Sequence, residues 1–201
     1  DAAREIDWFT PYSSILDDSR QPLYRWFPDA TCNTSYNCLD RHVASGRGEQ
    51  TAIIYDSPVT DTVQHISYRE LLDRVSRMAG ALDKLGISKG DRVVIYMPMV
   101  PEAAVAMQAC ARLGAVHSVV FGGFAANELA SRIDDCAPKL IVSASCGIEP
   151  SGLVPYKPLL DQALELSQHK PKHTIILQRQ QLTAELLPGR DLDWTEMETF
   201  A

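Results

Sequence analysis

This 201-residue sequence lacks an excess of positive charge, long apolar runs and closely spaced cysteine pairs. Its formal net charge is −7, which argues against a nucleic-acid partner because the phosphate backbone is itself negative. No apolar run approaches the roughly 18 residues that a membrane span requires, so we expect no membrane partner. Residues 1–5, DAARE, do not have the pattern of a signal peptide. The composition is that of an ordinary globular protein.

The five cysteines are odd in number and include no Cys-x-x-Cys pair. This pattern predicts reduced, mostly buried thiols rather than a disulfide framework. It indicates a cytoplasmic protein, with the mitochondrial matrix as the alternative location. Cys38 and His42 have a loose metal-like spacing, but there is no second pair nearby, so we predict no metal site.

Recognisable catalytic motifs are also missing. The sequence contains no Gly-x-x-x-x-Gly-Lys loop, no run rich in Ser, Thr and Gly, and no serine-nucleophile elbow. His117 lies within a predicted strand, where we expect a packed or hydrogen-bonded core residue. His169 and His173 are four residues apart, but Pro171 between them prevents a shared helical face. The residues alone therefore assign no catalytic group.

The middle of the sequence predicts a strand, a helix and a second strand that ends at a pair of glycines. Residues 93–97 form a short, largely β-branched run that suits a strand buried on both faces. Pro101 is well placed to begin a helix over 102–113, and Gly114 is the natural end of that helix. Residues 115–121 again suit a buried strand.

Further elements are predicted on both sides of this stretch. Ser67 and Glu70 form a capping box that starts a helix with an apolar core stripe, and Asn127 or a neighbour is expected to cap a later helix. The other predicted segments are strands 51–56 and 62–67 as a hairpin, helix 127–135, strand 139–143, loop 145–156, helix 158–168 and strand 174–177. This order predicts an α/β fold, a mostly parallel sheet with helices on both faces.

Residues 1–45 have the features of a separate N-terminal arm. Periodicity is weak there, and the arm contains large aromatic residues such as Trp8 and Trp26. Large aromatics on an irregular segment usually pack it against the body of a protein. We therefore expect the arm to dock on the α/β domain.

Two loops are expected to meet at one edge of the sheet. Gly122 and Gly123 follow the second strand, and residues 146–152 follow the third. In open α/β sheets, ligands settle at the carboxyl ends of the strands, and glycines allow a close approach to the backbone. The alternatives are that the glycines only make a tight turn and that residues 146–152 are an ordinary surface loop.

Four sequence words carry a resemblance to a known family. They are Gly90-Asp91-Arg92-Val93, Tyr96-Met97-Pro98-Met99-Val100-Pro101-Glu102, Ala109-Cys110-Ala111-Arg112-Leu113-Gly114-Ala115-Val116-His117-Ser118 and Phe121-Gly122-Gly123-Phe124. They resemble the acetyl-CoA/propionyl-CoA synthetase branch of the AMP-forming, adenylate-forming enzymes, and the propionate type most closely. Trp26-Phe27 and Asp40-Arg41-His42 resemble the N-terminal cap of the same branch. Members are much longer, so the resemblance covers only their N-terminal part.

The resemblance implies an acid–thiol ligase of fatty acid metabolism. Such an enzyme joins a short-chain carboxylate, propionate or acetate, to AMP from ATP with Mg²⁺, and then passes the acyl group to CoA. This portion would supply part of the CoA site and no catalytic or metal-binding residue. The implied CoA-site residues are Gly122, Gly123, Glu149, Pro150, Ser151 and Gly152. Residues 149–152 depart from the family because they include no arginine, which leaves backbone N–H groups and nearby Lys157 to contact phosphate.

We therefore expect residues 1–45 to be an N-terminal cap and residues 46–201 to be the first part of an AMP-binding domain. The expected partners are the small-molecule substrates and the remainder of the catalytic domain. Because the ATP-holding motifs are missing, the chain alone is expected not to adenylate a carboxylate. The alternative is a non-catalytic α/β domain that binds a nucleotide or a protein partner. An enzyme fragment, unlike such a module, should leave an unpaired sheet edge or apolar face.

Overall fold

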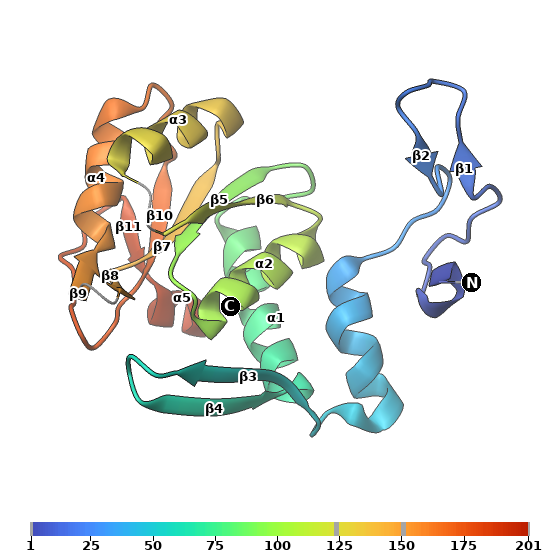
Figure 1. Cartoon of the computed structure of the whole chain (residues 1–201), viewed down its shortest axis with the longest axis horizontal. Coiled ribbons are helices and arrows are strands. Elements are labelled where there is room, and N and C mark those ends of the chain that lie inside the picture. Colours follow the sequence, from blue (N-terminus) through green and yellow to red (C-terminus); the bar gives the residue numbers. More distant parts are fainter. Residues whose placement is uncertain (1, 123–124, 150–151, 201) are drawn as a thin grey trace.

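Five parallel strands form the central sheet of the computed structural model, which describes residues 2–122, 125–149 and 152–200 (Figure 1). The strands are β5 (Arg92–Met97), β6 (Val116–Phe121), β7 (Leu140–Ala144), β10 (His173–Leu177) and β11 (Asp191–Asp193). Their order in space is β11-β10-β7-β5-β6, and each neighbouring pair is parallel. The chain thus places β6 on one side of β5 and the later strands on the other. The predicted parallel α/β sheet is confirmed.

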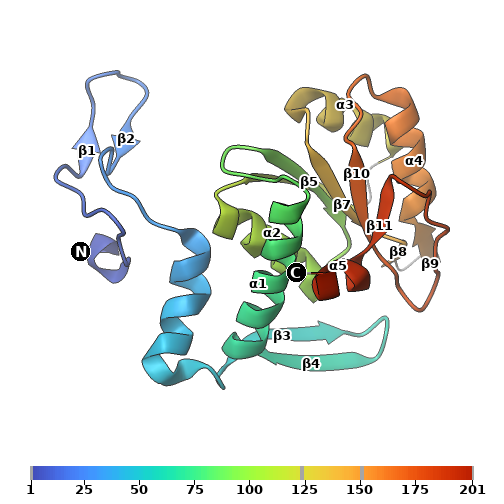
Figure 2. The ribbon, with the colours of Figure 1, turned by 180° about the vertical axis from the view of Figure 1, so that it is seen from behind.

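Helices cover both faces of this sheet (Figures 1 and 2). One face holds α1 (Tyr68–Lys84), α2 (Pro101–Leu113) and α5 (Trp194–Phe200), and the other holds α3 (Ala126–Cys136) and α4 (Tyr156–Leu166). Alternate residues of β5 divide between the two cores: Val93 and Ile95 face α1 and α2, whereas Val94 and Tyr96 face α3 and α4. Burial on both faces explains why this strand is a continuous apolar run.

The hairpin and the first long helix agree with the prediction. β3 (Thr51–Ser57) pairs antiparallel with β4 (Thr62–Ser67), which leads directly into α1. The Ser67 hydroxyl accepts a hydrogen bond from the Glu70 N–H at 3.2 Å, and the Glu70 carboxylate accepts one from the Ser67 N–H at 2.8 Å. The predicted capping box is therefore present, and it satisfies two donors that a helix start would otherwise leave free.

Two of the three predicted helix ends also agree. Pro101 is the first residue of α2, and Gly114 ends that helix in the left-handed conformation with φ 73°. For α3, the predicted cap at Asn127 or a nearby residue is confirmed only in its approximate position, because Asn127 itself lies within the helix. Ala125 occupies the N-cap position, and no side-chain hydrogen bond caps the helix there. The start of α3 therefore depends on packing rather than on a capping side chain.

β6 lies at the edge of the sheet, which corrects the prediction of a strand buried on both faces. Its Val119 is 52% exposed and its Phe121 is 69% exposed, although Val120 is buried. His117 is also exposed, so its prediction as a core residue is wrong. The apolar run predicts a buried strand because its hydrophobicity resembles that of β5, but β6 is the last strand of the sheet and pairs only with β5.

The C-terminal part contains more regular structure than predicted. The segment expected to be a loop forms an antiparallel hairpin of β8 (Cys146–Glu149) and β9 (Gly152–Pro155). β11 and α5 were not predicted at all. β11 has only three residues and two of them are acidic, so its strand character depends on pairing with β10 rather than on local propensity.

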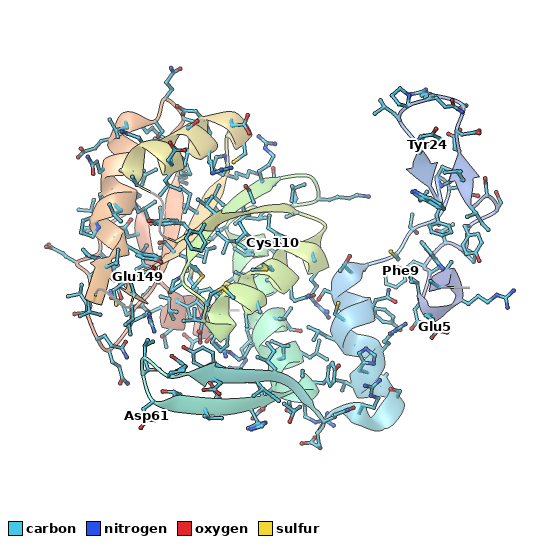
Figure 3. All side chains as sticks on the ribbon, in the orientation of Figure 1. Glu5, Phe9, Tyr24, Asp61, Cys110 and Glu149 are labelled. Carbon is cyan, nitrogen blue, oxygen red and sulfur yellow. The ribbon has the colours of Figure 1, made fainter. Side chains whose placement is uncertain are left out.

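The first part of the N-terminal arm, through residue 26, extends away from the sheet, whereas its helical end packs on the body (Figures 1 and 3). Its elements are η1 (Ala2–Glu5), β1 (Leu16–Asp17), β2 (Arg25–Trp26), η2 (Tyr36–Asp40) and η3 (Val43–Arg47). The aromatic residues contact one another, with 5.1 Å between the ring centroids of Trp8 and Phe27, and Trp26 is 65% exposed. The expected docking of the arm's aromatics is therefore not seen. Its helical end joins the body: Leu39 packs in the core with α1 and α2, and Asn33 Nδ2 donates to the Ala111 and Arg112 carbonyls at 3.1 Å. Arg112 also donates two hydrogen bonds to the Asp40 carboxylate.

All five cysteines are free thiols, as predicted, although only Cys110 and Cys146 are fully buried and Cys32 is exposed. Burial raises the pKa of Cys110 to about 12, which keeps that thiol protonated and unreactive at neutral pH. Among the described helices, none combines the length and apolar character needed to cross a bilayer.

Candidate functional site

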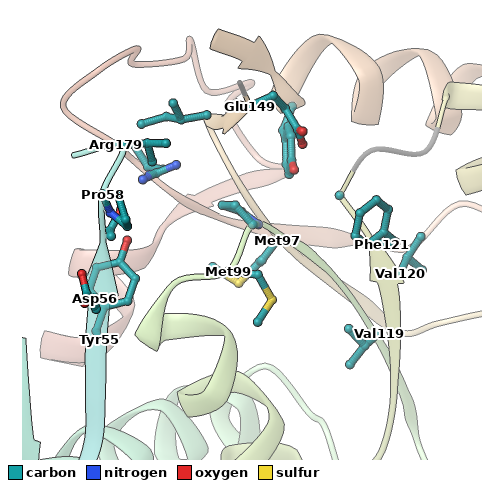
Figure 4. Close-up of a pocket in the computed structure, with 16 residues that line it drawn as sticks. Tyr55, Asp56, Pro58, Met97, Met99, Val119, Val120, Phe121, Glu149 and Arg179 are labelled. Atoms are coloured by element: carbon teal, nitrogen blue, oxygen red, sulfur yellow. The ribbon is translucent and has the colours of Figure 1, made fainter. Parts of the chain in front are cut away.

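A pocket of about 340 Å³ opens at the carboxyl ends of β5 and β6, beside the tip of the β3–β4 hairpin (Figure 4). The chain reverses its direction of sheet growth at β5, since β6 lies on one side of it and β7 on the other. Such a reversal leaves a crevice at the carboxyl ends of the strands, where open α/β sheets bind ligands. The topology therefore places this pocket where a binding site is expected.

Apolar side chains form most of the pocket wall. In Figure 4, Met97 and Met99 lie between the hairpin strand that carries Tyr55 and the end of β6 that carries Phe121. The full lining comprises Tyr55, Asp56, Ser57, Pro58, Val59, Met97, Pro98, Met99, Val119, Val120, Phe121, Gly122, Ile148, Glu149, Tyr156 and Arg179. A wall of this kind suits an extended, mostly apolar ligand with one or two polar groups.

The structure brings together the described parts of the two predicted loops. Gly122 and Glu149 both line the pocket, so the predicted meeting of the turn after β6 with the segment after β7 is confirmed for these residues. Gly123, Pro150 and Ser151 lie outside the described residues. Gly152 starts β9 and is not part of the pocket lining. The assignment of any of these residues to CoA stays a prediction.

Tyr156 lies between the two loops, a position that no sequence pattern predicted. Its ring is 2% exposed and stacks on Tyr96, with 4.9 Å between ring centroids. A Cβ atom placed on Gly122 would lie 2.0 Å from Tyr156 Oη, and one placed on Gly147 would lie 2.6 Å from Tyr156 Cε1. The close approach predicted for the glycine turn is therefore made by a side chain of the same protein. Neither glycine has a positive φ.

Two acidic groups and one basic group stand around the pocket. Asp56 and Glu149 contribute carboxylates, and Arg179 is the one cation among the described lining residues. The Arg179 guanidinium donates to the Cys146 carbonyl at 3.2 Å, and its backbone N–H donates to Ser145 Oγ at 2.8 Å. These contacts hold Arg179 at the rim, where it can meet an anionic group of a ligand.

The predicted phosphate contact from Lys157 does not fit the structure. Lys157 Nζ lies 2.6 Å from the Asp161 carboxylate and 3.0 Å from the Asp191 carboxylate, and its side chain is only 5% exposed. Its charge is neutralised by these two carboxylates, one in α4 and one at the start of β11. Arg179, which no sequence pattern singled out, takes the place of a cation near residue 149 because β10 ends beside β7.

Tyr156, which lies near Glu149 and Arg179, is a neutral phenol at neutral pH. Burial raises the pKa of Tyr156, and the nearby Glu149 carboxylate raises it further, although Arg179 acts in the opposite direction. Burial and the adjacent Tyr156 raise the pKa of Tyr96 to about 12. The two rings can therefore act through shape and hydrogen bonding rather than through ionisation.

Comparisons with known proteins agree on one family. A model described as "AMP-binding enzyme" matches residues 40–198, and one described as "Acetyl-coenzyme A synthetase N-terminus" matches residues 1–38. Human "Acyl-CoA synthetase short-chain family member 3, mitochondrial" is 52% identical over 97% of this chain and 29% of its own length. "Acetyl-coenzyme A synthetase" of Pasteurella multocida is 48% identical over 98% of this chain and 30% of its own length. An uncharacterized protein of Pseudomonas aeruginosa is 58% identical over 96% and 31%. The chain thus spans less than a third of these relatives.

Proposed function

This chain belongs to the AMP-binding enzyme family, and from that premise we propose that it is the N-terminal part of an AMP-forming acyl-CoA synthetase. The longer protein activates a short-chain carboxylate with ATP, releasing pyrophosphate, and transfers the acyl group from acyl-AMP to the CoA thiol, releasing AMP. Propionate is the first choice of acid and acetate the second. The observation that carries the proposal is a match over nearly all of this chain and under a third of each relative.

Within that protein, we assign this chain the scaffold and part of the CoA site. The pocket beside Gly122 and Glu149 has an apolar wall that suits the pantetheine arm, and Arg179 at its rim can meet a phosphate. Gly123, Pro150, Ser151 and Gly152 complete the proposed set. ATP and Mg²⁺ would be held by residues outside this chain.

The exposed edge of β6 favours this proposal over a self-sufficient binding module. Val116, Val119 and Phe121 are each more than half exposed on one edge strand, which is the kind of surface that soluble domains usually protect. A stretch of the longer protein would cover it.

The proposal also includes the division into a cap at residues 1–45 and a domain from residue 46. It places the protein in the cytoplasm or the mitochondrial matrix, with neither nucleic acid nor membrane as a partner.

Two assays test the proposed function. The longer natural protein, given ATP, Mg²⁺, propionate and CoA, should produce pyrophosphate, AMP and propionyl-CoA, and acetate in place of propionate ranks the acids. Omitting CoA should leave exchange of labelled pyrophosphate into ATP but no thioester. A longer protein that consumes no ATP with either acid would contradict the proposal and favour the non-catalytic alternative.

A further inference from the structure

Positions 122 and 147 require glycine for the same steric reason, and not because of their backbone conformation. Neither has a positive φ, so any residue could adopt their backbone geometry. Both positions are closed to a side chain by the same ring, since an added Cβ would lie 2.0 Å from Tyr156 at Gly122 and 2.6 Å from it at Gly147. Distances under 3.0 Å mean that ring or backbone would have to move.

The ring that fills this gap is held from several directions. Tyr156 stacks on Tyr96 of β5, and its backbone N–H donates to the Ser145 carbonyl at 3.1 Å. Tyr96 Oη donates to the Gly122 carbonyl at 3.3 Å, and Ser143 Oγ donates to the Tyr96 carbonyl at 2.8 Å. The stacked pair thus joins the ends of β5, β6 and β7, the three strands that border the reversal in sheet order.

We propose that Tyr156 is a positioning residue whose ring sets the spacing between the turn at Gly122 and the β8–β9 hairpin at Gly147. Gly122 and Glu149 line one pocket with Tyr156 between them, so the thickness of its ring determines how far apart the two loops lie. This inference rests on the proposed function in one respect: the ligand that enters between these loops is the CoA thiol arm. A misplacement of about 1 Å can reduce a reaction rate by about a hundredfold.

The first test measures packing alone and needs no activity. Thermal unfolding of this chain should show that Gly147→Ala lowers the midpoint by about 3–10 °C, because the added methyl meets a buried ring. In the Tyr156→Leu background, the same Gly147→Ala change should cost much less. Gly48→Ala is the matched control, because its methyl meets only the flexible end of Arg69. Equal costs of Gly147→Ala in the two backgrounds would overturn the steric part of the inference.

The second test separates positioning from stability in the longer protein. Tyr156→Leu should lower the CoA-dependent step about tenfold or more, through a higher KM for CoA, while carboxylate-dependent pyrophosphate exchange changes less than threefold. Tyr156→Phe keeps the ring and should keep both steps. If Tyr156→Leu does not fold, Gly147→Ala supplies the same comparison.

The outcomes of the second test distinguish the two proposals. A wild-type protein that forms no acyl-CoA would overturn the proposed function and leave the packing result standing. An active wild type in which Tyr156→Leu leaves the CoA step intact, or lowers both steps equally, would overturn the positioning role. Loss confined to the CoA-dependent step supports it.

Discussion

At the scale of single residues, the tertiary structure identifies a side chain that approaches the glycine turn. The sequence predicts a close approach to the backbone of Gly122, and the buried ring of Tyr156 occupies the space where a Gly122 side chain would be. Tyr156 and Gly122 line the pocket together with groups of both charges. We therefore expect Glu149 and Arg179 to influence the affinity for an anionic ligand in opposite directions.

The opposite charges at the rim predict opposite effects on CoA. In the longer protein, Arg179→Gln should raise the KM for CoA about tenfold or more, because a hydrogen bond to a charged group contributes about 1.5–3 kcal/mol. Glu149→Gln should lower it, since a carboxylate that repels phosphate is removed. Steady-state kinetics with CoA and with dephospho-CoA would identify the phosphate involved. An Arg179→Gln enzyme with unchanged KM for both thiols would exclude this role.

A buried charge network at the start of β11 predicts a pH dependence. Burial alone would raise the pKa of Asp191, but hydrogen bonds from Arg190, Thr174 and Lys157 outweigh it and lower the pKa. A folded-state pKa below the unfolded one stabilises the protein above the unfolded pKa of about 3.9, and this stability is lost as the pH falls below that value. The acid limb of the stability curve should thus depend on this carboxylate.

Replacing that carboxylate tests the assignment. Asp191→Asn should lower the free energy of unfolding by about 3 kcal/mol at pH 7 and make the loss between pH 4 and pH 2 shallower, as measured by urea unfolding. Asp73→Asn is the control, because its ion pair with Arg77 is exposed and such pairs contribute at most about 1 kcal/mol. Equal effects of the two substitutions would show that the network contributes no special stability.

At the scale of elements, the starts of α1 and α3 differ in whether nearby residues in the sequence determine them. The capping box of α1 was predictable because its two partners are three residues apart. The start of α3 has no side-chain cap, and its boundaries follow from the packing of Leu129 and Ile133 in the core. Local hydrogen bonds can be read along the chain, whereas packing against distant residues cannot.

This contrast predicts opposite results at the two helix starts. Ser67→Ala should lower the free energy of unfolding by about 1 kcal/mol, and Ser67→Asp should cost much less because it keeps a capping oxygen. Ala125→Ser should raise it by about 0.5–1 kcal/mol, because Glu128 already stands at the third helical position and completes a capping box. Urea midpoints measure both. A destabilised Ala125→Ser variant would contradict this account of α3.

At the scale of the whole molecule, the two edges of the sheet differ. β11 is short and carries Asp191 and Asp193, features that protect an edge from further pairing. β6 is longer and presents Val119 and Phe121 to solvent, so it has the character of a surface that another segment covers. We take that segment to be part of the proposed longer protein.

Amide hydrogen exchange tests this difference. The N–H groups of residues 116–121 that are not bonded to β5 should exchange readily in this chain and be protected about tenfold or more in the longer protein. The amides of β11 should change far less. In the longer protein, Val119→Lys should lower the thermal midpoint, because burying an unpaired charge is costly, whereas in this chain it should have little effect. Equal exchange of β6 in both proteins would show that its edge stays open.

The sequence by itself determined the order of the elements from β3 to β7, the capping box of α1 and the resemblance of the chain to the family, because these depend on residues close together along the chain. Only the tertiary structure decided that β6 is an edge strand, that residues 146–149 pair with residues 152–155, and that Tyr156 lies between Gly122 and Gly147. Each of these outcomes depends on contacts between residues far apart in sequence. Hydrophobicity and propensity indicate which secondary structure a segment can form. Packing against segments distant in sequence determines which of its faces are buried and which side chains fill the space between elements.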